Sequence, residues 1–552
     1  MAVNSGVLIN AGLEFGLIDA ETVAELRVKA RRERGDLIEI ITLHGRFPLA
    51  ALYQALAAQK GLPFLDSRDL LVDEALFRRI PPSLLQRRRC LPVRSQGDDF
   101  FLATADPEDF YAAEQISRIL GQTLTLAVAE PRTIEARLRT AFRQLEADAA
   151  AEIDSVAELD EILRQAYVNR ASDVHFAPGK EGMKVRFRVD GRLSDYPGDY
   201  SPEEAGSLLS RVKVLSGMDI SEQRLPQDGG MSHRVAEGRE FDIRVAAMPT
   251  RWGERGTLRL LEQDAVNLTL TKLGMGDTAL ARFREAIVRP HGMVLITGPT
   301  GSGKSTTLYA ALQEIVSPDI NVLTVEDPIE KVIAGISQVQ VGSKMSFAGA
   351  LRGFLRHDPD VIMVGEIRDP ETTDVALKAA LNGHMVFSTL HTNSAVSAVT
   401  RLRDIGAERF LIASTLVAVI AQRLVRRLCS HCKKARPADE KEKVLLEANE
   451  SALQLYEPSG CPICTGTGYR GRIGLFETLW IDEALAHTIA EGGSEGDLIA
   501  QAKDYVTLWD DGRDKVIAGV TSLDEVLRTV GAIRPDSRIA RDSRPKRGDG
   551  QV

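Results

Sequence analysis

A glycine-rich segment that ends in a lysine and two hydroxyl side chains lies between an apolar run and a helix-forming stretch. The apolar run, residues 293–296, is typical of a buried strand, and residues 306–314 predict a helix. Such a turn binds phosphate because its backbone N–H groups face inward and the helix N-terminus attracts anions. We expect Lys304 to reach the β- and γ-phosphates of a nucleotide and the Ser305 hydroxyl to hold Mg²⁺. The segment consists of Gly298, Pro299, Thr300, Gly301, Ser302, Gly303, Lys304, Ser305 and Thr306.

Three polar clusters downstream each follow an apolar run that predicts a strand, at residues 322–325, 361–364 and 385–389. Ligands of α/β sheets bind at the carboxyl ends of the strands, so we expect these clusters to lie near the nucleotide. One carboxylate there would polarise the attacking water, and another would hold the hydration shell of Mg²⁺. His384 lies before the third run, and a structural role and a catalytic role explain it equally. The clusters supply Glu326 and Glu330, then Glu366, and then His391.

Four of the five cysteines form two CxxC pairs, Cys429 with Cys432 and Cys461 with Cys464. Two such pairs predict tetrahedral thiolate ligation of a structural zinc ion. A redox role is the alternative, but one CxxC motif would serve it and two are present. The stretch between the pairs is longer than common zinc-ribbon spacings, so we predict a small helical insertion there. Cys90 is isolated.

The composition, 44% hydrophobic and 27% charged residues, is ordinary for a globular protein, and 552 residues imply about three to four domains. A net charge of −9 argues against nucleic-acid partners. We find no apolar run long enough to span a bilayer and no N-terminal signal segment. We therefore expect a cytoplasmic protein that reaches the membrane only through partners.

The elements around these motifs divide the chain into regions. The first 140 residues predict a small α/β region, with helices at 50–59 and 132–145 and a strand at 100–104. Residues 146–154 predict a linker, and a helix at 157–169 precedes strands at 183–189, 241–247 and 256–261. Residues 263–276 fit a second linker. Strands and helices then alternate to about residue 422, which predicts a parallel sheet.

The motifs taken together resemble the secretion-superfamily ATPases, which drive type II secretion, type IV pilus assembly and pilus retraction. The blocks GPTGSGKST, TVEDPIE, DPDVIMVGEIRDPET and GHMVFSTLHTN carry the resemblance, with ASDVH, VRFRVDG and RLPQDG upstream. The resemblance implies an α/β fold: a RecA-like parallel-sheet motor domain, an α+β (PAS-like) nucleotide-sandwiching domain, a small N-terminal docking domain and a zinc-knuckle insertion. The expected bounds are 1–145 for docking, 155–262 for the PAS-like domain, 266–533 for the motor including the zinc module at 425–470, and a disordered tail at 534–552.

Carried onto this sequence, the resemblance makes Glu330 the catalytic glutamate, with support from Glu326. Glu366 would act on magnesium, and His391 would sense the γ-phosphate or link neighbouring elements. Arg244 and Arg224 are the best candidates for arginine fingers, although a solvated strand face explains them equally. Gly230 follows RLPQDG where the family usually has arginine, so either Arg234 substitutes or one basic contact is missing.

The resemblance implies a homohexameric ATPase that powers type II secretion with ATP, Mg²⁺ and Zn²⁺. Its partners would be platform and docking proteins of the inner membrane, with the chain on the cytoplasmic side. Assembly-type members share the cysteine pairs, so type IV pilus assembly is the nearest alternative. A non-hydrolysing scaffold and a DNA-translocating motor are alternatives of other classes. Cyclic di-GMP is kept only as an alternative ligand, because Arg34-Gly35-Asp36-Leu37 and residues 52–59 match that motif in part.

Three arginines before the first cysteine pair, Arg423, Arg426 and Arg427, form a basic cluster with the YRGRIG segment after the second pair. Such a cluster could bind acidic partners, but a solvated helix face is the more common outcome.

Overall fold

The structure is a computed structural model. It describes residues 3–531 except 4, 34–36, 46–47, 67–68, 71, 73, 78, 95–99, 122, 146–154, 237–238, 262–268 and 449–451. The predicted linker at 146–154, residues 263–268 of the second linker, Arg34 to Asp36 and the predicted tail therefore lie outside the described residues. The chain forms two compact units: Met1–Glu262 with Ser459–Gly468, and Gln263–Pro458 with Tyr469–Val552. Each unit is described by itself.

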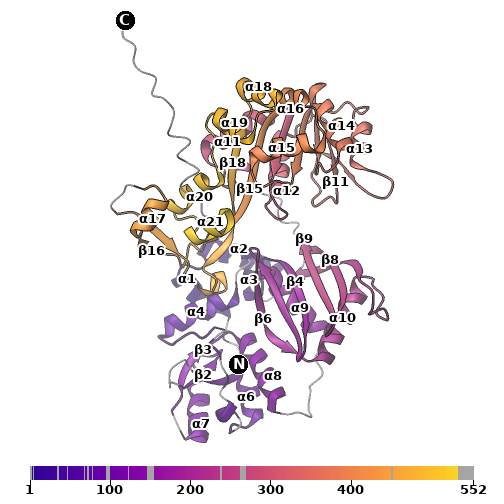
Figure 1. Cartoon of the computed structure of the whole chain (residues 1–552). Coiled ribbons are helices and arrows are strands. Elements are labelled where there is room, and N and C mark those ends of the chain that lie inside the picture. Colours follow the sequence, from indigo (N-terminus) through magenta and orange to yellow (C-terminus); the bar gives the residue numbers. More distant parts are fainter. Residues whose placement is uncertain are drawn as a thin grey trace. The chain divides into compact units, whose positions relative to one another are not determined.

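The N-terminal part of the first unit packs helices around a three-stranded sheet, as predicted for a small α/β region (Figure 1). Strand β2 (Phe100–Thr104) pairs antiparallel with β1 (Cys90–Arg94) and parallel with β3 (Thr125–Val128). The predicted helices are present as α4 (Leu49–Lys60) and α8 (Pro131–Leu145). The remaining helices are α1 (Ser5–Glu14), α2 (Ala20–Glu33), α3 (Leu37–Gly45), α5 (Glu74–Phe77), α6 (Pro82–Arg88) and α7 (Phe110–Leu120).

The rest of the first unit is an antiparallel six-stranded sheet with two helices, in the order β6-β5-β4-β9-β8-β7. Val174 and Phe176 of β4 are fully buried in the core that α9 and α10 share, so the residues that alternate with them face away from it. The elements are α9 (Ser155–Val168), β4 (Ala171–Gly179), β5 (Gly182–Val189), β6 (Arg192–Tyr200), α10 (Pro202–Leu215), β7 (Gln227–Ala236), β8 (Arg239–Thr250) and β9 (Gly253–Leu261).

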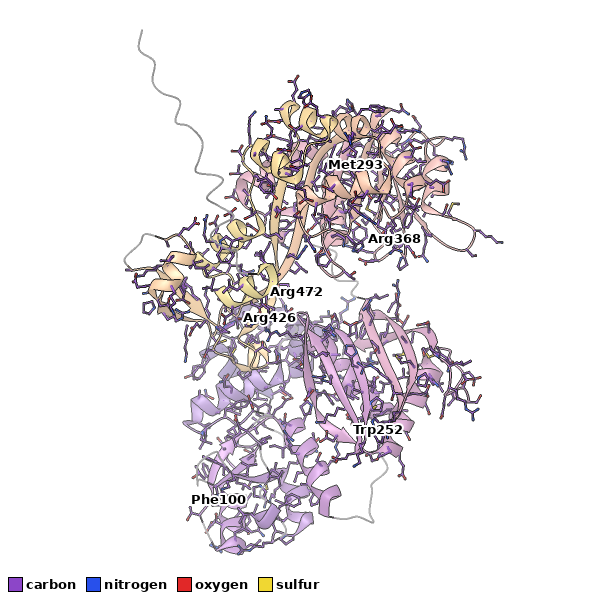
Figure 2. The ribbon with its side chains drawn as sticks, in the orientation of Figure 1. Phe100, Trp252, Met293, Arg368, Arg426 and Arg472 are labelled. Atoms are coloured by element: carbon purple, nitrogen blue, oxygen red, sulfur yellow. The ribbon has the colours of Figure 1, made fainter. Side chains whose placement is uncertain are left out.

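A seven-stranded sheet in the order β12-β11-β13-β14-β10-β15-β18 forms the second unit, and its first six strands are parallel, as predicted. All residues of β10 (Gly292–Thr297) are buried, with Met293 and Leu295 in one core and Val294 and Ile296 in another. Residues 293–296 of the strand are all apolar because helices cover both faces of the sheet. Met293 is labelled in Figure 2.

Strands and helices alternate along the chain in this unit, and short connections join them. The elements are η2 (Leu270–Leu273), α11 (Asp277–Ile287), α12 (Lys304–Ile315), β11 (Val322–Glu326), β12 (Ser337–Gln340), α13 (Phe347–Phe354), β13 (Val361–Val364), α14 (Pro370–Leu381), β14 (Met385–Leu390), α15 (Ala395–Ile405), α16 (Arg409–Thr415), α18 (Glu483–Glu491) and α19 (Glu495–Gln501). The predicted second linker holds a short 3-10 helix, η2, in its described part.

Two long antiparallel strands, β15 (Leu416–Leu428) and β18 (Tyr469–Trp480), form one edge of the sheet. They carry helices α20 (Leu508–Ile517) and α21 (Leu523–Val530). The predicted helical insertion is wrong in part, because β16 (Lys434–Pro437) and β17 (Gln454–Glu457) form a hairpin around one short helix, α17 (Glu440–Leu445).

The interpretation of the three arginines as a solvated helix face is also wrong. They lie on β15, and Arg426 is 7% exposed and donates hydrogen bonds of 2.9 and 2.6 Å to Glu525. Its guanidinium also lies 3.8 Å from the centre of the Tyr469 ring. A buried arginine needs such partners, because an unpaired charge in the core is costly. Among the described residues, no helix is both long and apolar enough to cross a membrane.

Candidate nucleotide site and cysteine cluster

The phosphate loop joins the buried strand β10 to helix α12, the placement the sequence predicts. Gly298 and Gly303 have φ of +151° and +88°, conformations that side chains rarely adopt. Added Cβ atoms would lie 2.5 Å from the Gln422 carbonyl at Gly298 and 2.9 Å from the Gln422 amide at Gly303. The loop thus requires glycine at both ends.

Lys304 lies at the start of α12 and is 9% exposed. Its Nζ donates to the carbonyl oxygens of Gly298 at 2.8 Å and Pro299 at 3.1 Å. Burial lowers the pKa of Lys304, while the carboxylates of Glu366 and Glu330 act in the opposite direction. The lysine and the two predicted acids therefore share one electrostatic environment at the carboxyl edge of the sheet.

Glu326, the last residue of β11, is 4% exposed, and three side chains donate to it. The Thr324 hydroxyl donates at 2.7 Å and the Gln338 amide at 2.9 Å, and the Tyr309 hydroxyl is the third donor. A carboxylate enclosed in this way cannot also approach a water molecule freely. This geometry suits the predicted role of Glu326 in supporting Glu330, which stays a prediction.

Tyr309 connects this buried acid to Glu330. Its hydroxyl donates to Glu326 and accepts from the Glu330 backbone N–H at 3.3 Å. Burial raises the pKa of Tyr309, and the hydrogen bond to Glu326 raises it further, so the phenol keeps its proton. The Glu330 side chain itself is exposed. Sequence reasoning missed Tyr309 because a tyrosine on an apolar helix face normally indicates core packing alone.

Glu366 follows β13, and His391 follows β14, on adjacent strands. His391 Nε2 lies 3.3 Å from one Glu366 carboxylate oxygen, and Arg368 Nη2 lies 2.5 Å from the other. The sheet thus brings together Glu366 and His391, each of which the sequence placed at the end of an apolar strand. His384 differs, because its Nδ1 contacts the Ala379 carbonyl at 2.9 Å at the end of α14, which fits the structural interpretation.

The two candidate arginine fingers lie in the first unit. Arg244 is exposed on β8, directly opposite Gly230 of β7. Arg224 is exposed in the loop before β7, where its backbone N–H donates to Glu222 Oε1 at 2.6 Å. Arg234 is also exposed on β7. Gly230 has no side chain opposite Arg244 on the β7 side, whereas Arg259 of β9 lies opposite Arg244 on the other side.

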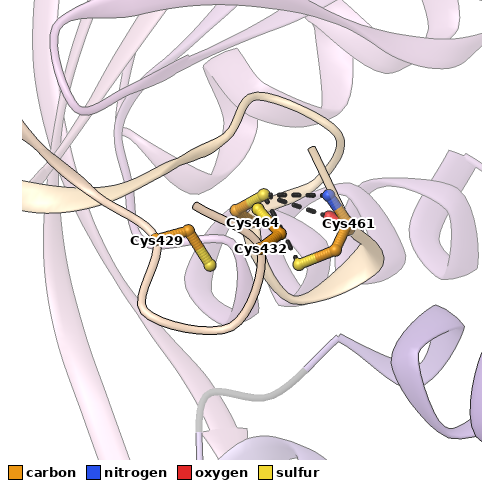
Figure 3. A group of neighbouring side chains, drawn as sticks. All are labelled: Cys429, Cys432, Cys461 and Cys464. Carbon is orange, nitrogen blue, oxygen red and sulfur yellow. Dashed lines mark hydrogen bonds between the residues drawn. The ribbon is translucent and has the colours of Figure 1, made fainter. Parts of the chain in front are cut away.

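The four paired cysteines lie together, as predicted (Figure 3), with their sulfur atoms within 4.8 Å of one another. Cys429 and Cys464 are 1% and 4% exposed. The Cys464 sulfur accepts from the backbone N–H groups of Cys461 at 3.2 Å and Gly468 at 3.1 Å. Backbone donors of this kind stabilise a thiolate, the form that binds metal. The cluster therefore fits a tetrahedral zinc ion.

A parallel sheet with a glycine-rich phosphate loop, a buried lysine and acids at the same edge defines the class of P-loop ATPases. The chain matches the family described as Type II/IV secretion system protein over residues 147–528, and the MshEN domain over residues 61–148. The chain therefore belongs to the type II/IV secretion system protein family, and the predicted resemblance is confirmed.

Relatives of known name agree with this assignment. The chain is 44% identical over 490 residues to the type II secretion system ATPase E of Vibrio cholerae, covering 82% of this chain and 96% of that protein. It is 39% identical over 536 residues to the type IV pilus assembly ATPase PilB of Thermus thermophilus, covering 91% of this chain and 60% of that protein. The structure of the Legionella pneumophila ATPase DotB superposes with a TM-score of 0.51 at 25% identity, covering 69% of this chain and 96% of that one.

Proposed function

We propose that the chain is the ATP-hydrolysing motor of a type II secretion system, active as a homohexamer. Glu330 would activate the water that attacks the γ-phosphate, and Ser305 and Glu366 would hold Mg²⁺, which would offset the charge of the phosphates. The observation that carries the proposal is the carboxyl edge of the parallel sheet, where the phosphate loop with Lys304 follows β10, and Glu330 and Glu366 follow β11 and β13 of the same sheet. A non-hydrolysing scaffold would have no need for this combination of groups.

The phosphate loop has a feature that suits a bound nucleotide. Among the described residues, the buried Ser302 hydroxyl has no hydrogen-bond partner, and it lies inside the loop. A buried polar group without a partner is costly, and a phosphate oxygen would satisfy it. The loop residues 298–306 would hold the phosphates of ATP.

Hydrolysis in one motor domain would drive motion against the PAS-like domain, and inner-membrane platform and docking proteins would receive it. We place the chain on the cytoplasmic side of that membrane, with domains at 1–145, 155–262 and 266–533. Arg244 and Arg224 would reach the nucleotide as arginine fingers. Zinc at the four cysteines would hold the module at 425–470 together.

Type IV pilus assembly is the second candidate, and the 91% coverage of this chain by the Thermus relative favours it. Deletion of the gene in its host, with complementation by the wild type and by Glu330→Gln, separates the two. Loss of secreted proteins with intact pili supports type II secretion, and loss of pili with intact secretion supports pilus assembly. The Glu330→Gln variant should complement neither defect, and full complementation by it would refute the assignment of the catalytic glutamate.

Cyclic di-GMP remains an alternative ligand of the N-terminal domain.

A further inference from the structure

Strand β15, next to β10, places a buried amide against the phosphate loop. Gln422 is 2% exposed, and its Oε1 accepts a hydrogen bond of 2.7 Å from the Thr307 hydroxyl of α12. Its backbone carbonyl and its side-chain amide approach Gly298 and Gly303, the two ends of the loop. Gln422 therefore holds the loop and the first turn of α12 against β15.

The next residue, Arg423, lies beside the same loop and binds the segment that follows His391. Its Nη1 donates to the Gln422 carbonyl at 3.0 Å, and a Cβ on Gly298 would lie 3.1 Å from that nitrogen. Its Nη2 donates to the backbone and side-chain oxygens of Asn393 at 3.1 and 3.2 Å. The planar guanidinium thus links strand β15 to the loop that follows β14, and it lies beside Gly298 of the phosphate loop.

The segment around Asn393 is held from its other side as well. The Ala395 N–H donates to Glu477 at 2.6 Å, and the Tyr505 hydroxyl donates to the same oxygen at 2.7 Å. The Thr392 N–H donates to the Thr297 hydroxyl, at the end of β10, at 2.9 Å. These hydrogen bonds fix residues 392–395 on the side away from Arg423. A displacement of Arg423 would therefore change the position of Asn393 relative to these fixed residues.

The charges of Arg423 and Lys304 also indicate that Arg423 responds to a nucleotide in the loop. Burial lowers the pKa of Arg423, and Glu477 opposes that change. Burial also lowers the pKa of Lys304, and the neighbouring Arg423 adds to the lowering. Two partly desolvated cations beside one loop repel each other, and the phosphates of a bound nucleotide would offset that repulsion.

We propose that Gln422 and Arg423 are positioning residues of the nucleotide site. Gln422 fixes the phosphate loop to β15, and Arg423 couples occupancy of the loop by a nucleoside polyphosphate to the segment 391–394 that carries His391. The proposal rests on the ATPase site and does not depend on which machine the motor drives.

The first test compares Arg423→Gln with Arg427→Gln, which removes the same charge from an exposed position on the same strand. Calorimetric titration with ADP and with a non-hydrolysable ATP analogue gives the affinities. Arg423→Gln should weaken binding about tenfold, because it removes a partly desolvated positive charge beside the phosphate loop, and Arg427→Gln should not. Arg423→Lys should restore the affinity but not kcat, because lysine cannot bridge Asn393. Equal affinities in the two glutamine variants would overturn the role of Arg423.

The second test is a double-mutant cycle of Thr307→Val and Gln422→Leu, read as KM for MgATP and as the thermal midpoint. Each variant should raise KM, and the double variant should raise it by less than the product of the two, because both remove one hydrogen bond. Changes in the thermal midpoint with an unchanged KM would show a merely structural role and overturn the proposal. Lys304→Ala serves as the reference, because retained binding in that variant would refute the phosphate-loop assignment itself.

Discussion

Tyr309→Phe tests whether the buried acid Glu326 positions the exposed catalytic candidate Glu330. The substitution removes one hydroxyl that donates to Glu326 and accepts from the Glu330 N–H. Glu326 keeps its bonds from Thr324 and Gln338, so the carboxylate remains partly satisfied. A hydrogen bond to a charged group contributes about 1.5–3 kcal/mol, which sets the expected loss of unfolding free energy.

The kinetic effect follows from the second bond. Without an acceptor for its N–H, the backbone at Glu330 is free to shift, and a misplacement of about 1 Å costs up to about 100-fold in rate. We expect kcat to fall at least several-fold while KM for MgATP stays nearly constant. Steady-state ATPase kinetics measure both, and urea unfolding followed by the fluorescence of Trp480 and Trp509 reports on the second unit.

Tyr200→Phe is the matched control, because the Tyr200 hydroxyl also donates to a buried glutamate, Glu158, at 2.5 Å in the first unit. It should lower the stability of that unit and leave kcat unchanged. Wild-type kcat and wild-type stability in Tyr309→Phe would refute the coupling between Glu326 and Glu330.

Three further predictions concern metal, a buried ion pair and pH. Replacing Cys429 and Cys461 by serine should abolish bound zinc, measured by elemental analysis, while Cys90→Ser keeps it; unchanged zinc in the double variant would contradict the tetrahedral site. Arg426→Met removes the buried ionic partner of Glu525, so urea unfolding should show a loss of about 3–5 kcal/mol, against little change for exposed Arg427→Met. Burial raises the pKa of Glu130 to about 7, with Arg132 opposing and Glu161 adding to the rise. A raised carboxyl pKa contributes stability that is complete below the unfolded pKa of about 4.3 and is lost as pH rises through about 7. The urea midpoint of the first unit should therefore decrease as the pH is raised from about 5 to about 8. The midpoint of Glu130→Gln should decrease less over the same range, and an equal dependence of the two midpoints on pH would contradict the assignment.

Local patterns predicted the parts of the fold that periodicity controls. The apolar runs at β10, β11, β13 and β14 are continuous because both faces of the sheet are covered, and this pattern is visible in the sequence alone. The phosphate loop and the cysteine pairs were predicted for the same reason, because their ligating residues are close in sequence.

Contacts between distant residues were not predictable from the sequence. Arg426 and Glu525 are 99 residues apart, so nothing near Arg426 indicated that it is buried rather than solvated. Gln422 pairs with Thr307 over 115 residues, and it follows an apolar run that could equally have ended at the surface. A polar residue directly after a long apolar run, opposite a phosphate loop in the sheet order, is the signal that could have indicated it.

The most direct test of the central claim is magnesium-dependent ATP turnover by the wild type and by Glu330→Gln, measured across size-exclusion fractions with light scattering. A hexameric secretion motor predicts turnover that is concentrated in the hexamer fractions and lost in the variant, with nucleotide binding retained. Full turnover by Glu330→Gln, or equal specific activity in monomer and hexamer fractions, would contradict it.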